Sequence, residues 1–338
     1  MANEAPKTLF HPFDAENLGL PGKSDRVLFL GAEPGFRLPE GWAASIHAVQ
    51  GFRPDFRALE RSGLEVTPRA EGEAYDLALV LVGRHRGQNE HRIAEAIERT
   101  VPDGLVVVAG AKEDGVASLR KRLAGIVEIE GAVPKYHGLA FWFRRPPGVE
   151  AAMALRAANP ATLVENRFHT APGMFSHDRV DPASRFLAGN LPPTLSGAVA
   201  DFCAGWGFLA AEVADGFSAV SSLDLYEADF ESLEAARTNL QAAPVQKNFF
   251  WHDLLAEPVQ RRYDAVVMNP PFHKGRAADP AGIGGGIIRA AAAALKPGGN
   301  LFLVANRHLP YEPVLAASFA NHKELARDAA FKVLAARR

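Results

Sequence analysis

The five residues 269–273, Asn-Pro-Pro-Phe-His, are the part of the chain whose types and order most clearly permit chemistry. They directly follow the apolar run 263–268 (YDAVVM), which predicts a buried parallel strand, and open α/β sheets bind ligands at the carboxyl ends of their strands. The side-chain oxygen of Asn269 and the carbonyl of Pro270 are two hydrogen-bond acceptors on a chain that Pro271 also stiffens. Two acceptors can hold both N–H donors of an exocyclic base amine and turn its lone pair toward an electrophile. The string therefore predicts transfer of a group to such an amine.

Phe272 and His273 extend this prediction to the base itself. The ring of Phe272 offers a flat surface for a base taken out of its stack, a contact worth roughly 1–3 kcal/mol. His273 is expected to contact the base or a phosphate rather than to act as a general base, because a methylated amine can lose its proton to water. With this string the chain resembles the class I methyltransferases that modify exocyclic amines. The resemblance implies S-adenosylmethionine as the cofactor.

The loop 201–207 (DFCAGWG) is similar to the D-x-G-x-G-x-G cofactor loop of these methyltransferases. The resemblance implies that Asp201, Cys203, Gly205 and Gly207 lie at the cofactor, since glycine lets a backbone approach a ligand closely. The sequence departs from the pattern at Cys203, which replaces the first glycine, so the backbone there must accept a Cβ. Taken alone, the loop also fits a plain turn between a strand and a helix.

Acidic residues follow the next two predicted strands, and the resemblance gives each a role toward the cofactor. An acid at the end of the second strand receives the ribose hydroxyls in the family, and a carboxylate suits two hydroxyl donors. Glu227 is preferred for this role and Asp224 is the second choice. The string 252–255 (HDLL) is similar to the family's Asp-x-Leu position, which implies that Asp253 accepts from the adenine amine and that Leu254 also lies at the cofactor. Asn269 completes the predicted cofactor site.

The segment upstream of the glycine loop narrows the resemblance. The string 172–176 (PGMFS), followed by Asp181 and Ser184, resembles bacterial ribosomal RNA guanine-N2 methyltransferases, of which there is a small-subunit enzyme and a large-subunit relative. The resemblance implies that the methyl group goes to N2 of a guanine in small-subunit 16S ribosomal RNA. The partner is this RNA or the ribosomal small subunit that contains it. Phe175, Ser176 and Asp181 are predicted to contact this substrate together with His273.

The elements that must position these residues follow an α/β rhythm in both halves of the chain. Short Val- and Leu-rich runs alternate with helical patterns, which predicts parallel sheets covered on both faces. The predicted strands are 26–30, 77–82, 105–109, 198–202, 220–226, 263–268 and 301–305, with a hairpin at 324–327 and 331–335, and the predicted helices are 55–62, 88–100, 149–158, 208–215, 230–242 and 287–295. The glycine-rich stretch 282–286 is expected to be a flexible loop or linker.

The fold class is therefore α/β, with two tandem doubly wound Rossmann-like methyltransferase domains. The breaker cluster Arg-Pro-Pro-Gly at 145–148 places the boundary between domains 1–147 and 148–338. In the first half, the stretch 30–35 (LGAEPG) stands where a cofactor loop would be but lacks the aspartate and the tight glycine spacing. The resemblance implies a diverged first domain that has lost the cofactor and helps to grip RNA. Basic clusters at 84–86, 120–122 and 144–145 are its candidate phosphate contacts.

The composition agrees with an ordinary globular enzyme. The 338 residues are 48% apolar and 22% charged with a net charge of −2, and Cys203 is the only cysteine. A Cys-rich zinc site is thereby excluded, and we expect no metal, no transmembrane helix, no signal peptide, a cytoplasmic location and a monomer. A protein that coats nucleic acid without specificity is disfavoured by the charge.

Three other readings remain open from the sequence. An N6-adenine or glutamine-amide methyltransferase shares the Asn-Pro-Pro-aromatic string, and the large-subunit guanine-N2 enzyme shares the upstream segment as well. A non-catalytic RNA-binding assembly factor would be a different class of protein, and Cys203 in the glycine loop is the one feature that favours it.

Overall fold

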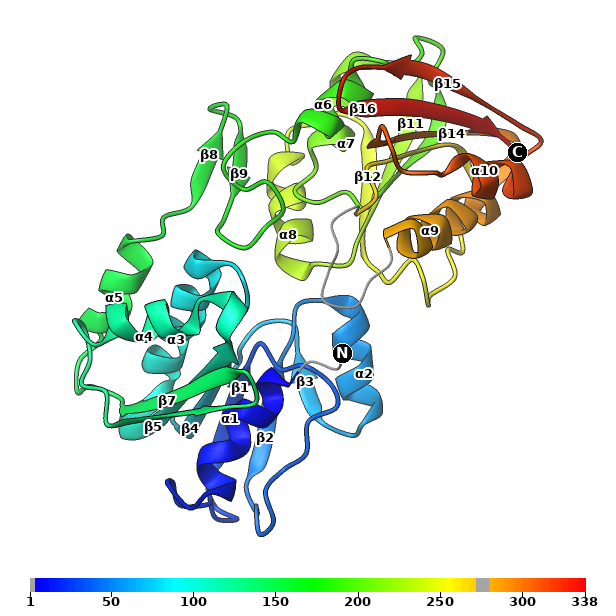
Figure 1. The fold of residues 1–338 in the computed structure, drawn as a ribbon. Helices are drawn as coiled ribbons and strands as arrows, with labels where there is room; N and C mark the ends of the chain where they lie inside the picture. The colour runs from blue at the N-terminus through cyan, green and yellow to red at the C-terminus, as the bar shows by residue number, and fades with distance from the viewer. Residues whose placement is uncertain (1–3, 272–279) are drawn as a thin grey trace. The chain divides into compact units, whose positions relative to one another are not determined.

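The structure is a computed structural model that describes residues 4–271 and 280–338. It divides into two compact domains, a first domain that ends at Ala161 and a second domain at Thr162–Arg338. Each domain is a seven-stranded sheet with helices on both faces (Figure 1). The prediction of two tandem doubly wound α/β domains is therefore confirmed.

The first domain has the strand order β3-β2-β1-β4-β5-β7-β6, in which β7 runs antiparallel to β5 and β6. Its strands are β1 (Arg26–Leu30), β2 (Ser45–Val49), β3 (Glu65–Thr67), β4 (Tyr75–Leu81), β5 (Thr100–Ala111), β6 (Gly131–Lys135) and β7 (Gly138–Arg144). Its helices are α1 (Ala5–Asp14), α2 (Arg53–Arg61), α3 (Arg86–Arg99), α4 (Val116–Leu123) and α5 (Glu150–Ala157). Separate clusters of buried apolar side chains cover the two faces of this sheet.

The second domain repeats the same order as β12-β11-β10-β13-β14-β16-β15. Its strands are β10 (Gly197–Phe202), β11 (Val220–Glu227), β12 (Gln246–Trp251), β13 (Tyr263–Met268), β14 (Leu295–Asn306), β15 (Asn321–Arg327) and β16 (Phe331–Arg337), preceded by a hairpin of β8 (Thr162–Val164) and β9 (Phe168–Thr170). Its helices are α6 (Pro182–Ala188), α7 (Phe208–Gly216), α8 (Phe230–Asn239), α9 (Pro280–Ala294) and α10 (Glu312–Ser318). The shared topology supports the internal duplication that the repeated rhythm suggests.

The order of the strands brings the predicted site together. β10 lies between β11 and β13, with Phe202 opposite both Tyr226 and Met268. The three strands are parallel, so the loops after Phe202, Glu227 and Met268 all leave the same edge of the sheet. The direction in which the sheet is wound changes between β10 and β13, and open α/β sheets bind ligands at the carboxyl edge beside such a switch point.

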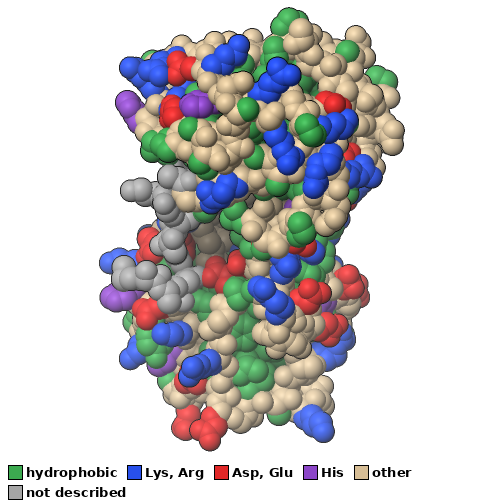
Figure 2. Space-filling model, turned by 90° about the vertical axis from the view of Figure 1, so that its right-hand side faces the viewer, with side chains coloured by type: hydrophobic (Ala, Val, Ile, Leu, Met, Phe, Trp, Pro, Cys, Tyr) green, Lys and Arg blue, Asp and Glu red, His purple; other side chains and the backbone are tan. Residues whose placement is uncertain are grey.

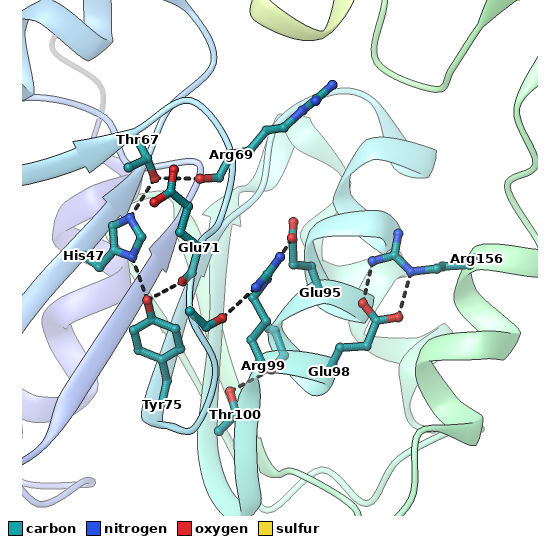
Figure 3. A network of polar contacts seen from close by, with 12 residues as sticks. His47, Thr67, Arg69, Glu71, Tyr75, Glu95, Glu98, Arg99, Thr100 and Arg156 are labelled. Carbon is teal, nitrogen blue, oxygen red and sulfur yellow. Dashed lines mark hydrogen bonds and ion pairs between the residues drawn. The ribbon is translucent and has the colours of Figure 1, made fainter.

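The boundary between the domains lies after α5 rather than before it. The division falls between Ala161 and Thr162, whereas the sequence placed it after residue 147. The reason is that α5 packs against α3: Arg156 forms a two-pronged ion pair with Glu98, at 2.8 and 2.6 Å (Figure 3). The Pro-rich cluster is a turn within the first domain and does not separate the domains.

The expected loop at 282–286 is instead part of the helix α9. Close packing explains two of its glycines, Gly284 and Gly286. A Cβ on Gly284 would lie 2.0 Å from the Tyr311 hydroxyl, and one on Gly286 would lie 2.5 Å from Leu255 Cδ2. Glycine lets the helix approach these side chains, which a sequence pattern alone does not reveal.

Candidate active site

The glycine loop forms one wall of a pocket at the carboxyl edge of the second sheet. The pocket is also lined by the segment that contains Phe175 and Ser176 and by Asn269. The indole N–H of Trp206 donates to the carbonyl of Phe175 at 2.9 Å, which joins the two walls. Phe175 is 48% exposed, so its ring is available at the mouth of the pocket. Residues that are far apart in sequence thus enclose one site within the second domain.

The backbone of the glycine loop is left-handed at three positions. Cys203 has φ +61°, which a residue with a Cβ adopts at a cost, and burial raises the pKa of its thiol. Gly205, at φ +54°, has nothing within 4 Å of where a Cβ would be, so this side of the loop is open. Gly207, at φ +89°, starts α7, and a Cβ there would lie 2.6 Å from Leu240 Cδ1. Gly205 therefore leaves space for a ligand, while Gly207 serves packing against α8.

Glu227 lies at the end of β11 and is bonded to the glycine loop. Its carboxylate accepts from the Gly205 N–H at 2.7 Å and from the Asp229 N–H at 2.8 Å. Burial raises the pKa of Glu227 from 4.5 to about 7. A half-buried carboxylate at the carboxyl edge, hydrogen-bonded to the open glycine loop, is suited to accept hydroxyl donors from a ligand.

Asp224 is buried three residues earlier on β11 and is fully engaged by the protein. It accepts from Asn248 Nδ2 at 2.7 Å, from Arg261 at 2.9 Å and from the Tyr263 hydroxyl at 2.7 Å. Its neighbour across the ladder is Ala200, well inside the sheet. The geometry thus favours Glu227 over Asp224 as a ligand-facing acid, because Asp224 stabilises the sheet.

Asp253 and Leu254 follow β12 in a tight turn. Asp253 is buried, accepts from the Leu255 N–H at 3.0 Å, and its own N–H donates to Glu257 at 2.8 Å. Leu254 is half-buried against the core beside α9. The turn holds Asp253 at the same edge of the sheet as Glu227, since β11 and β12 pair in parallel up to Glu227 and Trp251.

Asn269 is the centre of the site, and its side-chain amide is held from one side only. Its Nδ2 group donates to Asp181 Oδ2 at 2.9 Å and to Ser184 Oγ at 2.8 Å. Its Oδ1 atom is buried and has no hydrogen-bond partner within the described part of the chain. Pro270 is buried and Pro271 is exposed, while Phe272 and His273 lie outside the described residues.

Asp201 is the second buried group with unmet hydrogen-bonding capacity. It is fully buried near the end of β10, and neither carboxylate oxygen has a partner among the residues that the structure describes. Burial raises the pKa of this carboxyl well above its usual range, and the nearby Glu227 carboxylate raises it further. Unpaired buried acceptors cost about 1–3 kcal/mol each, so a site that keeps two of them is expected to bind donors.

Comparisons with known proteins identify the domain that carries this pocket. The family model named Methyltransferase small domain matches residues 165–335. The chain is 30% identical, over 89% of its own length and 90% of the relative, to the ribosomal RNA small subunit methyltransferase C of Pseudomonas aeruginosa. The protein of the same name from Psychromonas ingrahamii is 27% identical, over 82% of this chain and 80% of the relative.

This chain belongs to the methyltransferase small domain family. A solved structure supports the assignment. The T. thermophilus 16S rRNA N2 methyltransferase RsmC, determined in complex with AdoMet and guanosine, matches with a TM-score of 0.79 at 26% identity, over 100% of this chain and 94% of that one.

Two parts of this candidate site escaped the sequence interpretation. Trp206 was not singled out, although its indole joins the walls of the pocket. Ser184 was noted only as part of a matching segment, and its contact with Asn269 was not foreseen. The signal that was available is the spacing Asp181-x-x-Ser184, which is typical of a helix N-cap and does mark the start of α6.

The first domain of the methyltransferase places an arginine where the second has its open loop. Gly31 follows β1 as Cys203 follows β10, and a Cβ at Gly31 would lie 2.6 Å from the Arg92 guanidinium. Arg92 also donates to the Leu81 carbonyl at the end of β4, at 2.9 Å. The guanidinium therefore fills the switch point of the first sheet, between β1 and β4.

Most of the basic clusters predicted in the first domain are engaged within it. Arg122 pairs with the buried Glu90 at 2.7 Å, and Arg145 is buried and donates to the Ile97 carbonyl at 2.9 Å. Arg144 bonds the Asp103 carbonyl. These side chains hold the domain together, whereas Arg120 and Lys121 on α4 remain exposed. The sequence could not distinguish the engaged basic residues from the exposed ones, because both occur in polar segments that a sequence pattern assigns to the surface.

Proposed function

We propose that this chain transfers a methyl group from S-adenosylmethionine to the exocyclic N2 of a guanine in small-subunit 16S ribosomal RNA. The observation that carries the proposal is the buried Asn269 Oδ1, an acceptor with no donor in the described chain at the carboxyl end of β13. An exocyclic amine supplies the missing N–H donor. The T. thermophilus relative, named for N2 methylation of 16S rRNA and solved with guanosine, supports guanine over other amines.

The residues of the pocket fit the proposed cofactor. The open side of Gly205 admits a ligand close to the backbone, and the unpaired carboxylate of Asp201 can accept from an ammonium group. Glu227 would accept the ribose hydroxyls and Asp253 the adenine amine. S-adenosylmethionine would supply a methyl group bound to positively charged sulfur, which is a strong electrophile. Burial raises the pKa of both Asp201 and Glu227, and a bound cation beside them would favour their ionised forms.

The protein's own contribution to the reaction is orientation. Asn269 Oδ1 and the Pro270 carbonyl would each accept one N–H of the amine, which directs the nitrogen lone pair out of the plane of the base. Holding the reacting nitrogen in that orientation removes part of the entropic cost of bringing it to the methyl group. Phe272 remains the predicted stacking surface for the base and Phe175 a second aromatic side chain at the mouth. The product amine would release its proton to water, so no general base is required.

Contacts to the RNA backbone are proposed on the second domain as well as the first. Most charged side chains on the face of the second domain that carries β15, α10 and α9 are Lys or Arg (Figure 2). Arg179 precedes α6 and Arg307 follows β14, and both are exposed with no side-chain partner in the described part of the chain. α6 packs against β14, and both elements flank Asn269, so each arginine lies next to an element that flanks the site. They are suited to phosphates beside the target nucleotide.

No metal or membrane is part of the proposal. Among the described residues, no group of three His, Cys, Asp or Glu side chains could hold a metal ion. In the same part of the chain, no helix combines the length and apolar character needed to cross a bilayer. A monomer acting in the cytoplasm, where ribosomal RNA is found, remains a prediction.

The test is methyl transfer from labelled S-adenosylmethionine to ribosomal subunits and to purified ribosomal RNAs, followed by identification of the product nucleoside. N2-methylguanosine in small-subunit RNA is the expected product. N6-methyladenosine, a methylated glutamine, or label confined to large-subunit RNA would overturn the choice of substrate. Absence of cofactor binding in calorimetry would instead indicate a non-catalytic RNA-binding protein.

A further inference from the structure

We propose that Asp181 is a positioning residue that, with Ser184, fixes the orientation of the Asn269 amide so that its oxygen faces the substrate. The sequence assigned Asp181 to substrate contact, and no role was assigned to Ser184. This inference rests on the proposed function, because it concerns the same amine-binding oxygen. In this inference the Phe-Ser…Asp…Ser segment influences the substrate indirectly, by orienting the side chain of Asn269.

The direction of each hydrogen bond at Asn269 follows from which groups can donate. A carboxylate only accepts hydrogen bonds, so the atom of Asn269 that lies 2.9 Å from Asp181 Oδ2 must be the NH₂ group. Ser184 Oγ, at 2.8 Å, accepts from the same NH₂ group. Both amide hydrogens are thereby used on one side, and Oδ1 is turned to the other side with no partner among the described residues.

Without these two acceptors the orientation would not be determined. An asparagine amide is nearly symmetric in shape, and a half-turn about its last bond exchanges oxygen for NH₂. In the turned state the substrate amine would meet a donor where it needs an acceptor, and the two N–H groups would repel. The Asp181 carboxylate excludes that state because it would then face Asn269 Oδ1.

The two acceptors Asp181 and Ser184 are themselves held in place by the start of α6. Asp181 is the N-cap of this helix, and the same Oδ2 atom accepts from the Ser184 backbone N–H at 2.9 Å. Ser184 is buried, so its hydroxyl is not free to turn toward water. One carboxylate oxygen thus fixes both the end of the helix and the amide of Asn269.

The two roles of Asp181 can be separated by substitution. Asp181→Ser retains a good N-cap but is too short to reach Asn269, so it removes the grip and keeps the helix. Asp181→Asn keeps both, because its single amide oxygen can accept from the Ser184 N–H and from Asn269. Ser184→Ala removes the hydroxyl alone and leaves the backbone cap untouched.

The experiment measures single-turnover methyl transfer to small-subunit RNA, cofactor affinity by calorimetry, and melting temperature for full-length variants. Asp181→Ser is expected to slow transfer by roughly 10- to 100-fold and Ser184→Ala by about 5-fold, with cofactor affinity changed by less than about 3-fold. Asp181→Asn is expected to stay within about 5-fold of the wild-type rate. In the double variant with Asn269→Ala, Asp181→Ser should cause no further loss, because it acts through Asn269.

A second measurement does not depend on the substrate. The side-chain NH₂ signal of Asn269 in an amide NMR spectrum, assigned by its loss in Asn269→Ala, should exchange slowly with water in the wild type. It should shift and exchange faster in Asp181→Ser but not in Asp181→Asn. A wild-type signal in Asp181→Ser, or a double variant whose loss is the product of the two single losses, would overturn the positioning role. Full guanine methylation by Asn269→Ala would overturn the amine contact of Asn269, whereas a wild-type product other than N2-methylguanosine would overturn the proposed function.

Discussion

Replacing Glu227 by glutamine should make the stability of the ligand-free protein less sensitive to pH. The pKa of Glu227 is raised by burial to about 7 in the folded protein, against 4.5 for an ordinary glutamate. Between these values the unfolded chain is ionised while the folded chain keeps the proton. The contribution of this group to stability is therefore complete below pH 4.5 and is lost as the pH rises through 7.

The size of the effect follows from the two pKa values. At about 1.36 kcal/mol per pH unit, raising the pH from 5 to 8 removes roughly 2.5 kcal/mol from the free energy of unfolding through Glu227 alone. This is an upper limit, since Glu227 is only partly removed from solvent by surface area. Glutamine does not titrate, so the variant loses this part of the pH dependence. Burial raises the pKa of Asp201 in both proteins, and the variant loses only the part of that rise that the Glu227 charge causes.

The assay is urea denaturation of the wild type, Glu227→Gln and a surface control at pH 5 and pH 8. Glu212→Gln on α7 is a matched control, because its side chain is 39% exposed and the substitution removes one carboxyl from the same domain. Wild type and control should lose more stability between the two pH values than Glu227→Gln, by about 2 kcal/mol. An equal change in the free energy of unfolding of all three proteins, within about 0.5 kcal/mol, would refute the raised pKa of Glu227.

Three further outcomes are expected. Asn269→Ala should lower the methyl-transfer rate by about 10²–10³-fold in single-turnover assays while the cofactor still binds in calorimetry, and an unchanged rate would contradict the amine contact. Cys203→Gly should keep or raise stability by up to about 1 kcal/mol in urea denaturation, because φ is +61° there, whereas Cys203→Val should lower it by about 1–3 kcal/mol. Calorimetry should give one S-adenosylmethionine per chain, because Arg92 fills the switch point of the first sheet. A stoichiometry of two would contradict that.

The sequence predicted most of the second domain because its strands are short apolar runs with clear ends. The predicted strand 263–268 coincides with β13, and the helix and strand around the glycine loop differ from α7 and β10 by one residue each. Less apolar elements were missed. The strands β3 and β6 at the two edges of the first sheet are half-exposed, so their patterns lack the continuous buried run that marks a central strand. The apolar strand β7 was missed as well.

The candidate site could be predicted as a set of residues but not as a set of contacts. The order of the strands brings the segments of Glu227, Asp253 and Asn269 to one edge, which parallel topology makes foreseeable. The choice between Glu227 and Asp224 depended on which carboxylate the protein itself engages, and that requires Arg261 in space. Side-chain hydrogen bonds between distant segments leave no period in the sequence, so structure alone could supply them.

The hydrogen bond from Trp206 to the Phe175 carbonyl has a consequence for how the two ligands influence one another. It ties the loop that would meet the cofactor to the segment that would meet the base. Cofactor that fixes the loop in place also fixes that segment, so RNA then binds to a wall already ordered. By thermodynamic linkage, bound RNA must raise the affinity for the cofactor by the same factor. We therefore expect the two ligands to bind cooperatively in this pocket, with the hydrogen bond of the Trp206 indole as the contact that couples them.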